Sequence, residues 1–305
     1  MTLINNRLKY FLMPRHIKSK WSYNDFLYMH MQKMDIKKIE TFLTDEELVA
    51  AEKKLNDDAY RKYFNNKLLF YERFGSFMKR DVISLRDITE NYLLSFVKKH
   101  KRVALKPVDK YAGIGFSTAY ADRVGNVIFS KDTPSFEEMQ KQLYIAEDYV
   151  YQHKAYSDVY PKSLNTLRVT TYIDSDGKPD ILFVVNQFGS EGSITDNDDI
   201  KGIWCVTDKE SGIIKVCEED EKNGFVYDTH PDTNIKFSGF QNPYFEEVKK
   251  TALRAALVVP KCRLVGWDIA VREDGEIVII EGNVTPELSM YQRLSGDGLK
   301  RIAET

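Results

Sequence analysis

The chain has 305 residues, of which 43% are hydrophobic and 30% are charged, and its formal net charge is −2. This composition is typical of a soluble globular protein, and a chain of this length can bury a large core across two or three lobes. The near-neutral charge gives no reason to expect a nucleic-acid or anionic-membrane partner.

The first residues, Met1-Thr2-Leu3-Ile4-Asn5, lack the apolar core of a signal peptide. No run approaches the roughly 18 apolar residues of a membrane span. The three cysteines, Cys205, Cys217 and Cys262, are scattered and fit neither a zinc site nor a disulfide framework. We therefore expect reduced thiols in a cytoplasmic protein.

Residues 1–100 are expected to form a helical N-terminal region. Thr44, followed three residues later by a glutamate, forms a capping box and predicts the start of one helix. The apolar spacing predicts further helices over 59–74 and 84–100, the last with a basic C-terminal end. Basic and aromatic side chains mix at residues 15–21, which fits either a solvated helix face or a surface that contacts a partner.

Residues 101–153 read as a small lobe of strands with one helix. A strand over 103–107 carries Lys106 and precedes a loop that contains Gly113 and Gly115. Glycines let backbone amides approach a phosphate, and a lysine beside them adds a positive charge. Two glycines in an ordinary hairpin loop would look the same, so this motif alone leaves both interpretations open.

Residues 154–305 read as a larger lobe. A strand over 166–173 turns at Asp176-Gly177 and returns, and a polar loop over 189–202 follows. Arg168 lies inside the first of these strands. An arginine inside a strand is usually a rim residue that reaches solvent or a partner in a structural salt bridge, and the alternative is a charge clamp on a phosphate.

A late hairpin carries the most informative pattern. Two apolar runs flank Asp274-Gly275, the strongest short-range signal for a hairpin with a two-residue type I′ turn. With these two residues as the loop, Asp268 lies directly opposite Glu281. Asn283, two residues further on, shares their face of the hairpin.

Like charges that face each other destabilise a hairpin, so an apolar hairpin with paired carboxylates is expected to hold a cation between them. Asp268, Glu281 and Asn283 offer two carboxylates and an amide oxygen, which are hard ligands suited to Mg²⁺ or Mn²⁺. The alternative is an exposed sheet face on which the two carboxylates are simply solvated.

Together, the lysine-bearing strand with its glycine loop, the arginine within a strand and the late Asp…Glu-x-Asn hairpin resemble the ATP-grasp superfamily. The resemblance extends from about Lys67 to Gln292 and is closest to the sugar-transfer-associated ATP-grasp family. The matching stretches are Gln152-His153, Ser163-Leu164-Asn165-Thr166-Leu167-Arg168, His230-Pro231 with Phe237-Ser238-Gly239, and Val265-Gly266-Trp267-Asp268 with Glu281-Gly282-Asn283.

The resemblance implies an α+β ATP-grasp fold, in which two α+β lobes clasp ATP, here preceded by a helical N-terminal domain. The implied divisions are 1–100, 101–153 and 154–305. Nucleotide binding is implied for Lys67, Lys106, Gly113 and Gly115, and adenine recognition at the hinge for Glu147, Tyr149 and Val150. Arg168 would contact the γ-phosphate or the acyl phosphate. Mg²⁺ would be bound by Asp268, Glu281 and Asn283. Arg168 and Lys106 would be the catalytic residues.

The implied activity is that of an ATP-dependent ligase. It would activate a small-molecule or sugar-linked carboxylate as an acyl phosphate and join it to an amine or hydroxyl, in the modification of surface polysaccharides or amino sugars. A kinase of the same fold and a non-catalytic nucleotide-binding protein are the alternatives. Gln187 and Lys201-Gly202 depart from the family pattern of an arginine and a paired glycine, so the acceptor loop is expected to differ.

Overall fold

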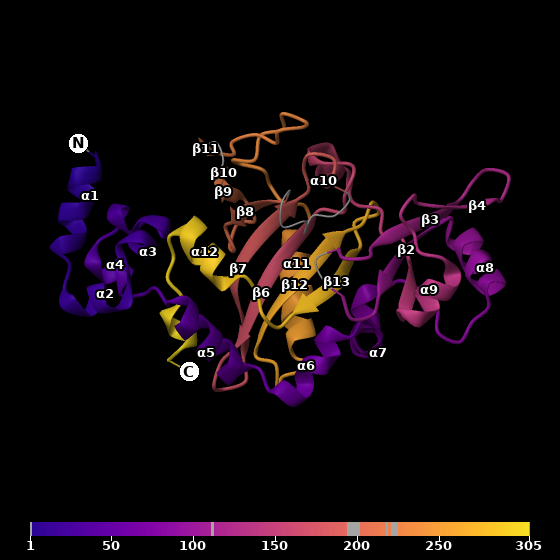
Figure 1. Ribbon diagram of the computed structural model, residues 1–305, viewed down its shortest axis with the longest axis horizontal. Helices are drawn as coiled ribbons and strands as arrows, with labels where there is room; N and C mark the ends of the chain where they lie inside the picture. Colours follow the sequence, from indigo (N-terminus) through magenta and orange to yellow (C-terminus); the bar gives the residue numbers. More distant parts are fainter. Residues whose placement is uncertain (1, 111–112, 194–201, 218, 221–224, 305) are drawn as a thin grey trace.

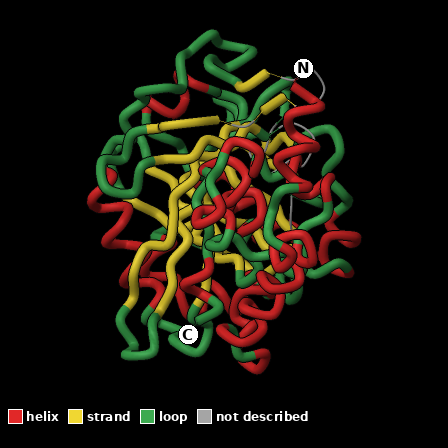
Figure 2. The backbone as a smooth tube through the Cα atoms, turned by 90° about the vertical axis from the view of Figure 1, so that its left-hand side faces the viewer, coloured by secondary structure: helices red, strands yellow, loops and turns green. Residues whose placement is uncertain are grey.

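A computed structural model describes residues 2–110, 113–193, 202–217, 219–220 and 225–304. The N-terminal helices lie at one end of the molecule, a large sheet lies in the middle, and a smaller sheet lies at the other end (Figure 1). Viewed from the N-terminal end, the strands lie behind and beside these helices (Figure 2). None of the described helices is long and apolar enough to cross a membrane.

The N-terminal module is a cluster of short helices around its own small core. That core includes Trp21, Phe26 and Phe42, all of them buried. Its elements are α1 (Thr2–Phe11), α2 (Arg15–Lys20), α3 (Tyr23–Tyr28), η1 (Met31–Lys33) and α4 (Ile36–Ile39).

Helix α5 (Asp45–Leu55) begins at the predicted capping box. Thr44 Oγ1 accepts from the Glu47 N–H at 3.3 Å, and Glu47 Oε2 accepts from the Thr44 N–H at 2.8 Å. Two backbone donors at the helix start are thereby satisfied, as the motif requires.

The continuous helix predicted over 59–74 is wrong, because the chain breaks at Asn66 into α6 (Asp58–Asn65) and α7 (Lys67–Met78). Asn66 is extended and caps α7, since its Oδ1 accepts from the N–H groups of Leu68 and Leu69. The break matters for the site because it makes Lys67 the first residue of α7.

The small lobe is a five-stranded antiparallel sheet with the order β1-β5-β2-β3-β4, covered on one face by two helices. The helix predicted from Ser84 is wrong in its start, because Ser84 pairs with Ile145 in β1 and the helix begins only after Thr89. The small lobe therefore starts near Val82, earlier than residue 101. Its elements are β1 (Val82–Ser84), α8 (Glu90–His100), β2 (Arg102–Pro107), β3 (Ser117–Ala121), β4 (Val127–Phe129), α9 (Phe136–Lys141) and β5 (Tyr144–Asp148).

The large lobe is a six-stranded antiparallel sheet with the order β13-β12-β6-β7-β8-β9. Helices α7 and α11 pack on one face, and α5 and α12 cover part of the other. The rest of that second face carries the site. The elements are α10 (Lys154–Val159), β6 (Thr166–Ile173), β7 (Pro179–Phe188), β8 (Ile203–Thr207), β9 (Ile214–Cys217), β10 (Glu219–Asp220), β11 (Phe225–Val226), α11 (Phe245–Ala256), β12 (Leu264–Val271), β13 (Ile277–Asn283), α12 (Leu288–Ser295) and η2 (Lys300–Ile302).

Residues 149–153 connect the two lobes and run beside the end of β12. The His153 N–H donates to Val271 O at 2.8 Å, and the Glu273 N–H donates to Tyr151 O at 2.9 Å. The connecting segment is therefore held against the β12–β13 hairpin.

Cys205 of β8 and Cys217 of β9 are direct neighbours across the two strands and form a disulfide. The expectation of three reduced thiols is thus wrong for this pair. Cys262 is the free cysteine, and it is buried. Burial raises the pKa of the Cys262 thiol to about 11.

Candidate active site

The turn of the β12–β13 hairpin differs from the predicted one. The Arg272 N–H donates to Glu276 O at 2.8 Å, so the loop holds the three residues 273–275 and not Asp274-Gly275 alone. Gly275 has φ +87°, the left-handed conformation that ends such three-residue loops. With this loop alone, the pairing would be shifted by one residue from the predicted register.

A β-bulge restores the predicted pairing. Ile269 pairs with Ile279 but Asp268 pairs with Glu281, so Ile280 is the extra residue. A shift of one residue moves side chains to the opposite face, and the bulge therefore brings Glu281 to the face of Asp268. The longer loop and the bulge cancel, so the prediction that Asp268 faces Glu281 is confirmed although the predicted turn is wrong.

Asp268 has a second partner across the sheet, because β12 also pairs with β6 and places Arg168 opposite it. Arg168 Nε and Nη2 donate to the two carboxylate oxygens of Asp268, each at 2.8 Å. The two residues are 4% and 2% exposed, which excludes a solvated Asp268. Arg168 is thus the structural partner of a carboxylate, and its contact with a phosphate stays a prediction.

Glu281 lies on the same face without such a partner. Among the residues that the structure describes, no hydrogen bond or ion pair engages its carboxylate. Burial and the neighbouring charge of Asp268 raise the pKa of Glu281, while Lys67, Lys106 and Arg168 oppose that rise. The arrangement is an acidic pair with cations at its edge.

Asn283 pairs with Gly266 and lies two residues beyond Glu281 on the same face. Its Oδ1 accepts from the N–H and the hydroxyl of Thr285, at 2.9 and 3.1 Å. Within the described part of the chain no group of three His, Cys, Asp or Glu residues could hold a metal. The predicted ligand set contains only two acids, and two carboxylates with an amide oxygen fit a hard divalent cation.

Two lysines interact with this acidic pair, Lys67 from α7 on the large sheet and Lys106 from the small lobe. Lys67 begins α7, where its N–H donates to Val108 O at 3.0 Å and its Nζ donates to Lys110 O. Lys106 is the next-to-last residue of β2, and its Nζ lies 3.3 Å from Glu147 Oε2. The positive charges of both lysines oppose the rise in the pKa of Glu281, so the site joins residues of both lobes. Burial lowers the pKa of Lys67, and Glu281 opposes that change.

Glu147, at the end of β5, is only 3% exposed and is held between two cations. Arg80 Nε donates to Glu147 Oε2 at 2.8 Å, and Lys106 approaches the same oxygen. Burial alone would raise the pKa of Glu147, but Arg80 and Lys106 outweigh it and lower the pKa to about 2. No sequence motif marked Arg80 as part of the site, and adenine recognition by Glu147 stays a prediction.

The other predicted hinge residues differ in their surroundings. The Tyr149 N–H donates to Arg102 O at 3.2 Å, and the Arg102 guanidinium carbon lies 3.9 Å from the centre of the Tyr149 ring. Tyr149 is therefore engaged within the small lobe. Val150 packs with Ala270 and Val278 of the hairpin, which forms an apolar wall where the lobes meet.

The glycine loop has a local explanation. Gly113 and Gly115 have φ of +72° and +74°, and a Cβ added to Gly115 would lie 2.7 Å from Tyr144 Oη and 2.8 Å from Pro107 Cγ. Packing alone thus requires glycine at 115, and phosphate binding by these residues stays a prediction. Tyr111 and Ala112 of this loop lie outside the described residues, as do residues 194–201 of the predicted acceptor loop.

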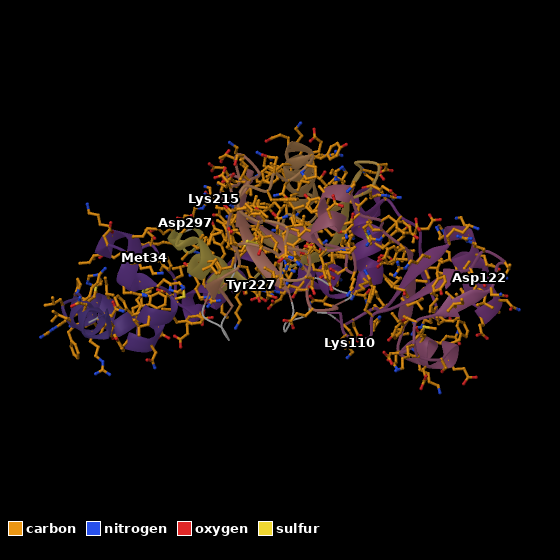
Figure 3. The ribbon with its side chains drawn as sticks, turned by 90° about the horizontal axis from the view of Figure 1, so that it is seen from above. Met34, Lys110, Asp122, Lys215, Tyr227 and Asp297 are labelled. Atoms are coloured by element: carbon orange, nitrogen blue, oxygen red, sulfur yellow. A yellow bond between two sulfur atoms is a disulfide. The ribbon has the colours of Figure 1, made fainter. Side chains whose placement is uncertain are left out.

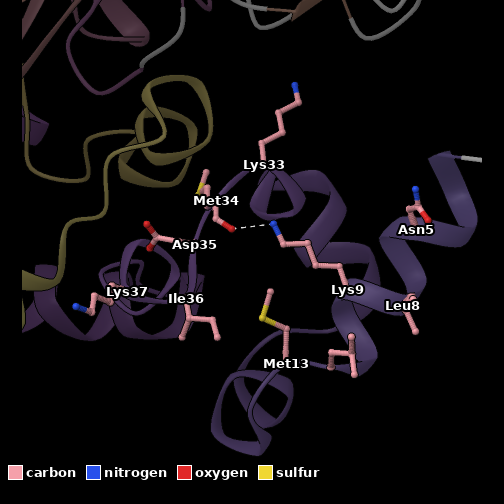
Figure 4. Close-up of a pocket in the computed structure, with 10 residues that line it drawn as sticks. Asn5, Leu8, Lys9, Met13, Lys33, Met34, Asp35, Ile36 and Lys37 are labelled. Carbon is pink, nitrogen blue, oxygen red and sulfur yellow. Dashed lines mark hydrogen bonds between the residues drawn. The ribbon is translucent and has the colours of Figure 1, made fainter.

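A separate groove of about 1020 Å³ lies in the N-terminal module, between α1 and the η1–α4 segment (Figure 4). Leu8, Leu12 and Ile36 line it, with Lys33 and Lys37 at its edge. Met34 of this groove and Lys110, whose carbonyl binds Lys67, lie in different parts of the molecule (Figure 3). The groove is therefore not part of the candidate active site.

The family model described as sugar-transfer associated ATP-grasp matches residues 51–305. The chain belongs to this ATP-grasp family. The two α+β lobes and the preceding helices thus confirm the predicted ATP-grasp fold class, and the helices before residue 51 lie outside the family match.

Several solved ATP-grasp structures are similar to the chain at low identity. The ligase PsnB, solved with a minimal precursor, is 13% identical with a TM-score of 0.47, and the match covers 82% of this chain and 61% of PsnB. D-alanyl-alanine synthetase A from Vibrio cholerae is 14% identical with a TM-score of 0.45, covering 79% and 63% of the two chains. The chain thus spans less than two thirds of the length of either structure. A search of the curated proteins found no match.

Proposed function

We propose that this protein is an ATP-dependent ligase that activates a carboxylate as an acyl phosphate and joins it to an amine or a hydroxyl. One observation carries the proposal: buried Asp268 and half-buried Glu281 form an acidic pair, and Glu281 interacts electrostatically with Lys67 of α7 and with Lys106 of the small lobe. A bound polyphosphate with a divalent ion has the charge that this arrangement complements.

The residues of the candidate active site match different parts of a magnesium nucleotide. Asp268, Glu281 and Asn283 would hold Mg²⁺ or Mn²⁺, which when bound neutralises phosphate charge. Lys67 and Lys106 would hold the phosphates. Arg168 orients Asp268 through its two hydrogen bonds and lies at the same edge as the acidic pair.

The reaction asks the protein mainly to position its substrates and neutralise charge. An oxygen of the substrate carboxylate bonds to the γ-phosphorus as the bond to the β–γ bridging oxygen breaks, and ADP leaves. An amine or hydroxyl then attacks the acyl carbon, inorganic phosphate leaves, and the nucleophile loses a proton. No covalent enzyme intermediate is needed.

The substrate class follows from the family description alone. A sugar-transfer association favours an amino-sugar or uronic-acid substrate in surface polysaccharide assembly, in the cytoplasm, where ATP is supplied.

The test is an ATP-consumption screen with pools of amino acids, amino sugars and sugar acids, followed by mass spectrometry of the product. A ligase releases ADP and phosphate and forms an amide or an ester. A phosphorylated product would instead identify a kinase. Full function of Asp268→Asn in cells would support the non-catalytic alternative.

A further inference from the structure

The buried guanidinium of Arg80 forms hydrogen bonds with both lobes. Arg80 lies in the short connection between α7 and β1 and is only 6% exposed. Its Nε donates to Glu147 Oε2 at 2.8 Å, its Nη1 to Ile279 O at 2.8 Å and its Nη2 to Ile280 O at 3.1 Å. One guanidinium therefore contacts β5 of the small sheet and β13 of the large sheet.

The two carbonyl contacts fall on the β-bulge of β13. Ile280 is the extra residue of that bulge, and Ile279 is the last residue before it in regular pairing. The bulge directs the Glu281 side chain to the side of the sheet on which Asp268 lies. By binding both carbonyls, the Arg80 guanidinium stabilises the bulge and therefore this orientation of Glu281. A lysine has no planar fork and cannot reproduce several directed contacts at once.

The contact with Glu147 links Arg80 to Lys106 of the small lobe. Glu147 Oε2 also lies 3.3 Å from Lys106 Nζ, so Arg80 and Lys106 share one carboxylate oxygen. By holding the Glu147 carboxylate in place, Arg80 also positions the acceptor that Lys106 Nζ contacts. Arg80 is thus joined to Lys106 through Glu147 and to Glu281 through the bulge.

We infer that Arg80 is a positioning residue that sets Lys106 of the small lobe and Glu281 of the large lobe relative to each other, an inference that rests on the proposed function. It does not itself touch the nucleotide. Loss of its contacts releases the bulge and leaves the Glu147 carboxylate with Lys106 as its remaining partner among these groups.

The test compares Arg80→Gln and Arg80→Lys with the control Arg272→Gln. Arg272 Nη1 donates to Lys79 O at 3.3 Å, so it joins the same hairpin to the same connection without touching the bulge or Glu147. Binding of ATP is measured by calorimetry over a Mg²⁺ series. We expect the Mg²⁺ needed for half-maximal binding to rise about 10- to 100-fold for both Arg80 variants, the range for loss of a residue that supports a metal ligand. The control should bind like wild type.

Hydrogen exchange of the amides in residues 277–283 gives a readout that is independent of nucleotide. We expect faster exchange there in the Arg80 variants than in Arg272→Gln. Arg80→Gln/Glu147→Gln removes both buried charges and serves where the single variant does not fold. Wild-type Mg²⁺ dependence and exchange in a folded Arg80 variant would overturn the inference.

The two hypotheses fail in different ways. If wild type binds no Mg-ATP, the proposed function fails, and the exchange experiment alone then decides whether Arg80 holds the bulge. If wild type binds Mg-ATP and the Arg80 variants do so at the same Mg²⁺ concentration, the function stands and the role of Arg80 is refuted.

Discussion

Glu147 of the small lobe and Glu281 of the large lobe belong to the same candidate site, but their surroundings shift their pKa values in opposite directions. Glu147 accepts from Arg80 and Lys106, and its pKa lies near 2 despite burial. Glu281 faces Asp268, and burial together with that carboxylate raises its pKa. The fold thus supplies Glu147 with two hydrogen-bonded cations, and under the proposed function a bound metal ion would supply the positive charge at Glu281.

We propose that this contrast separates a structural acid, Glu147, from a metal ligand, Glu281. A carboxylate that is paired within the protein stabilises the fold, whereas a buried acidic pair without a cation between its members costs free energy.

Glu281→Gln should lower Mg-dependent ATP turnover at least about 100-fold, the upper end of what loss of an outer ligand partner costs. Its thermal stability should not fall, because the change removes one of two facing carboxylates. Activity assays and thermal unfolding measure the two effects. Glu273→Gln, in the exposed turn of the same hairpin, is the control and should match wild type. A large loss of stability would place Glu281 in the same class as Glu147.

Lys106→Met should weaken ATP binding about 10- to 100-fold, because a hydrogen bond to a charged group contributes about 1.5–3 kcal/mol. The protein should stay folded, since Arg80 still pairs with Glu147. Calorimetry gives the affinity, and the exposed Lys131→Met is the matched control. Unchanged ATP affinity would mean that Lys106 serves Glu147 alone.

Glu147→Gln should lower the free energy of unfolding and flatten its acid dependence. The pKa of Glu147 in the folded state, about 2, lies below the ordinary value of 4.5. Its ionised form thus stabilises the fold fully above about pH 4.5, and this contribution is lost as the pH falls toward 2. Urea unfolding between pH 3 and 7 measures this, with the exposed Glu137→Gln as control. An equal acid dependence in wild type and variant would show that Glu147 is not the group responsible.

The cysteines should give the smallest functional effect. Wild type unfolded without a reductant should show one reactive thiol, from Cys262, and three after reduction. Native Cys262 should react slowly at pH 8, because its pKa is about 11 and it is buried. Three thiols in the oxidised, unfolded protein would refute the pairing of Cys205 with Cys217.

The acidic pair was predictable because side-chain alternation and a turn signal are local properties. The loop over 273–275 and the bulge at Ile280 were not, because the carbonyls of Ile279 and Ile280 bind Arg80, about 200 positions away. No local pattern around Arg80 marks that contact. The extra loop residue and the bulge residue happen to cancel, so the pairing was right for a partly wrong reason.

The remaining differences have similar causes. The break at Asn66 had a local signal, since asparagine is a favoured helix cap, but the apolar spacing masked it. The pairing of Cys205 with Cys217 depends on a register shift between Val206 and Thr207, and regular pairing continued from Thr207 and Ile214 would place Cys205 opposite Val216 instead. The bidentate pair of Arg168 with Asp268 required the order of β6 and β12 in the sheet, which the sequence does not reveal.

Binding of Mn²⁺, followed by electron paramagnetic resonance in the presence of ATP, tests most directly whether Glu281 is a metal ligand. Wild type should bind the Mn²⁺ nucleotide, Glu147→Gln should retain part of this binding, and Glu281→Gln should lose it. Equal Mn²⁺ binding by wild type and Glu281→Gln, or none by wild type, would contradict the account.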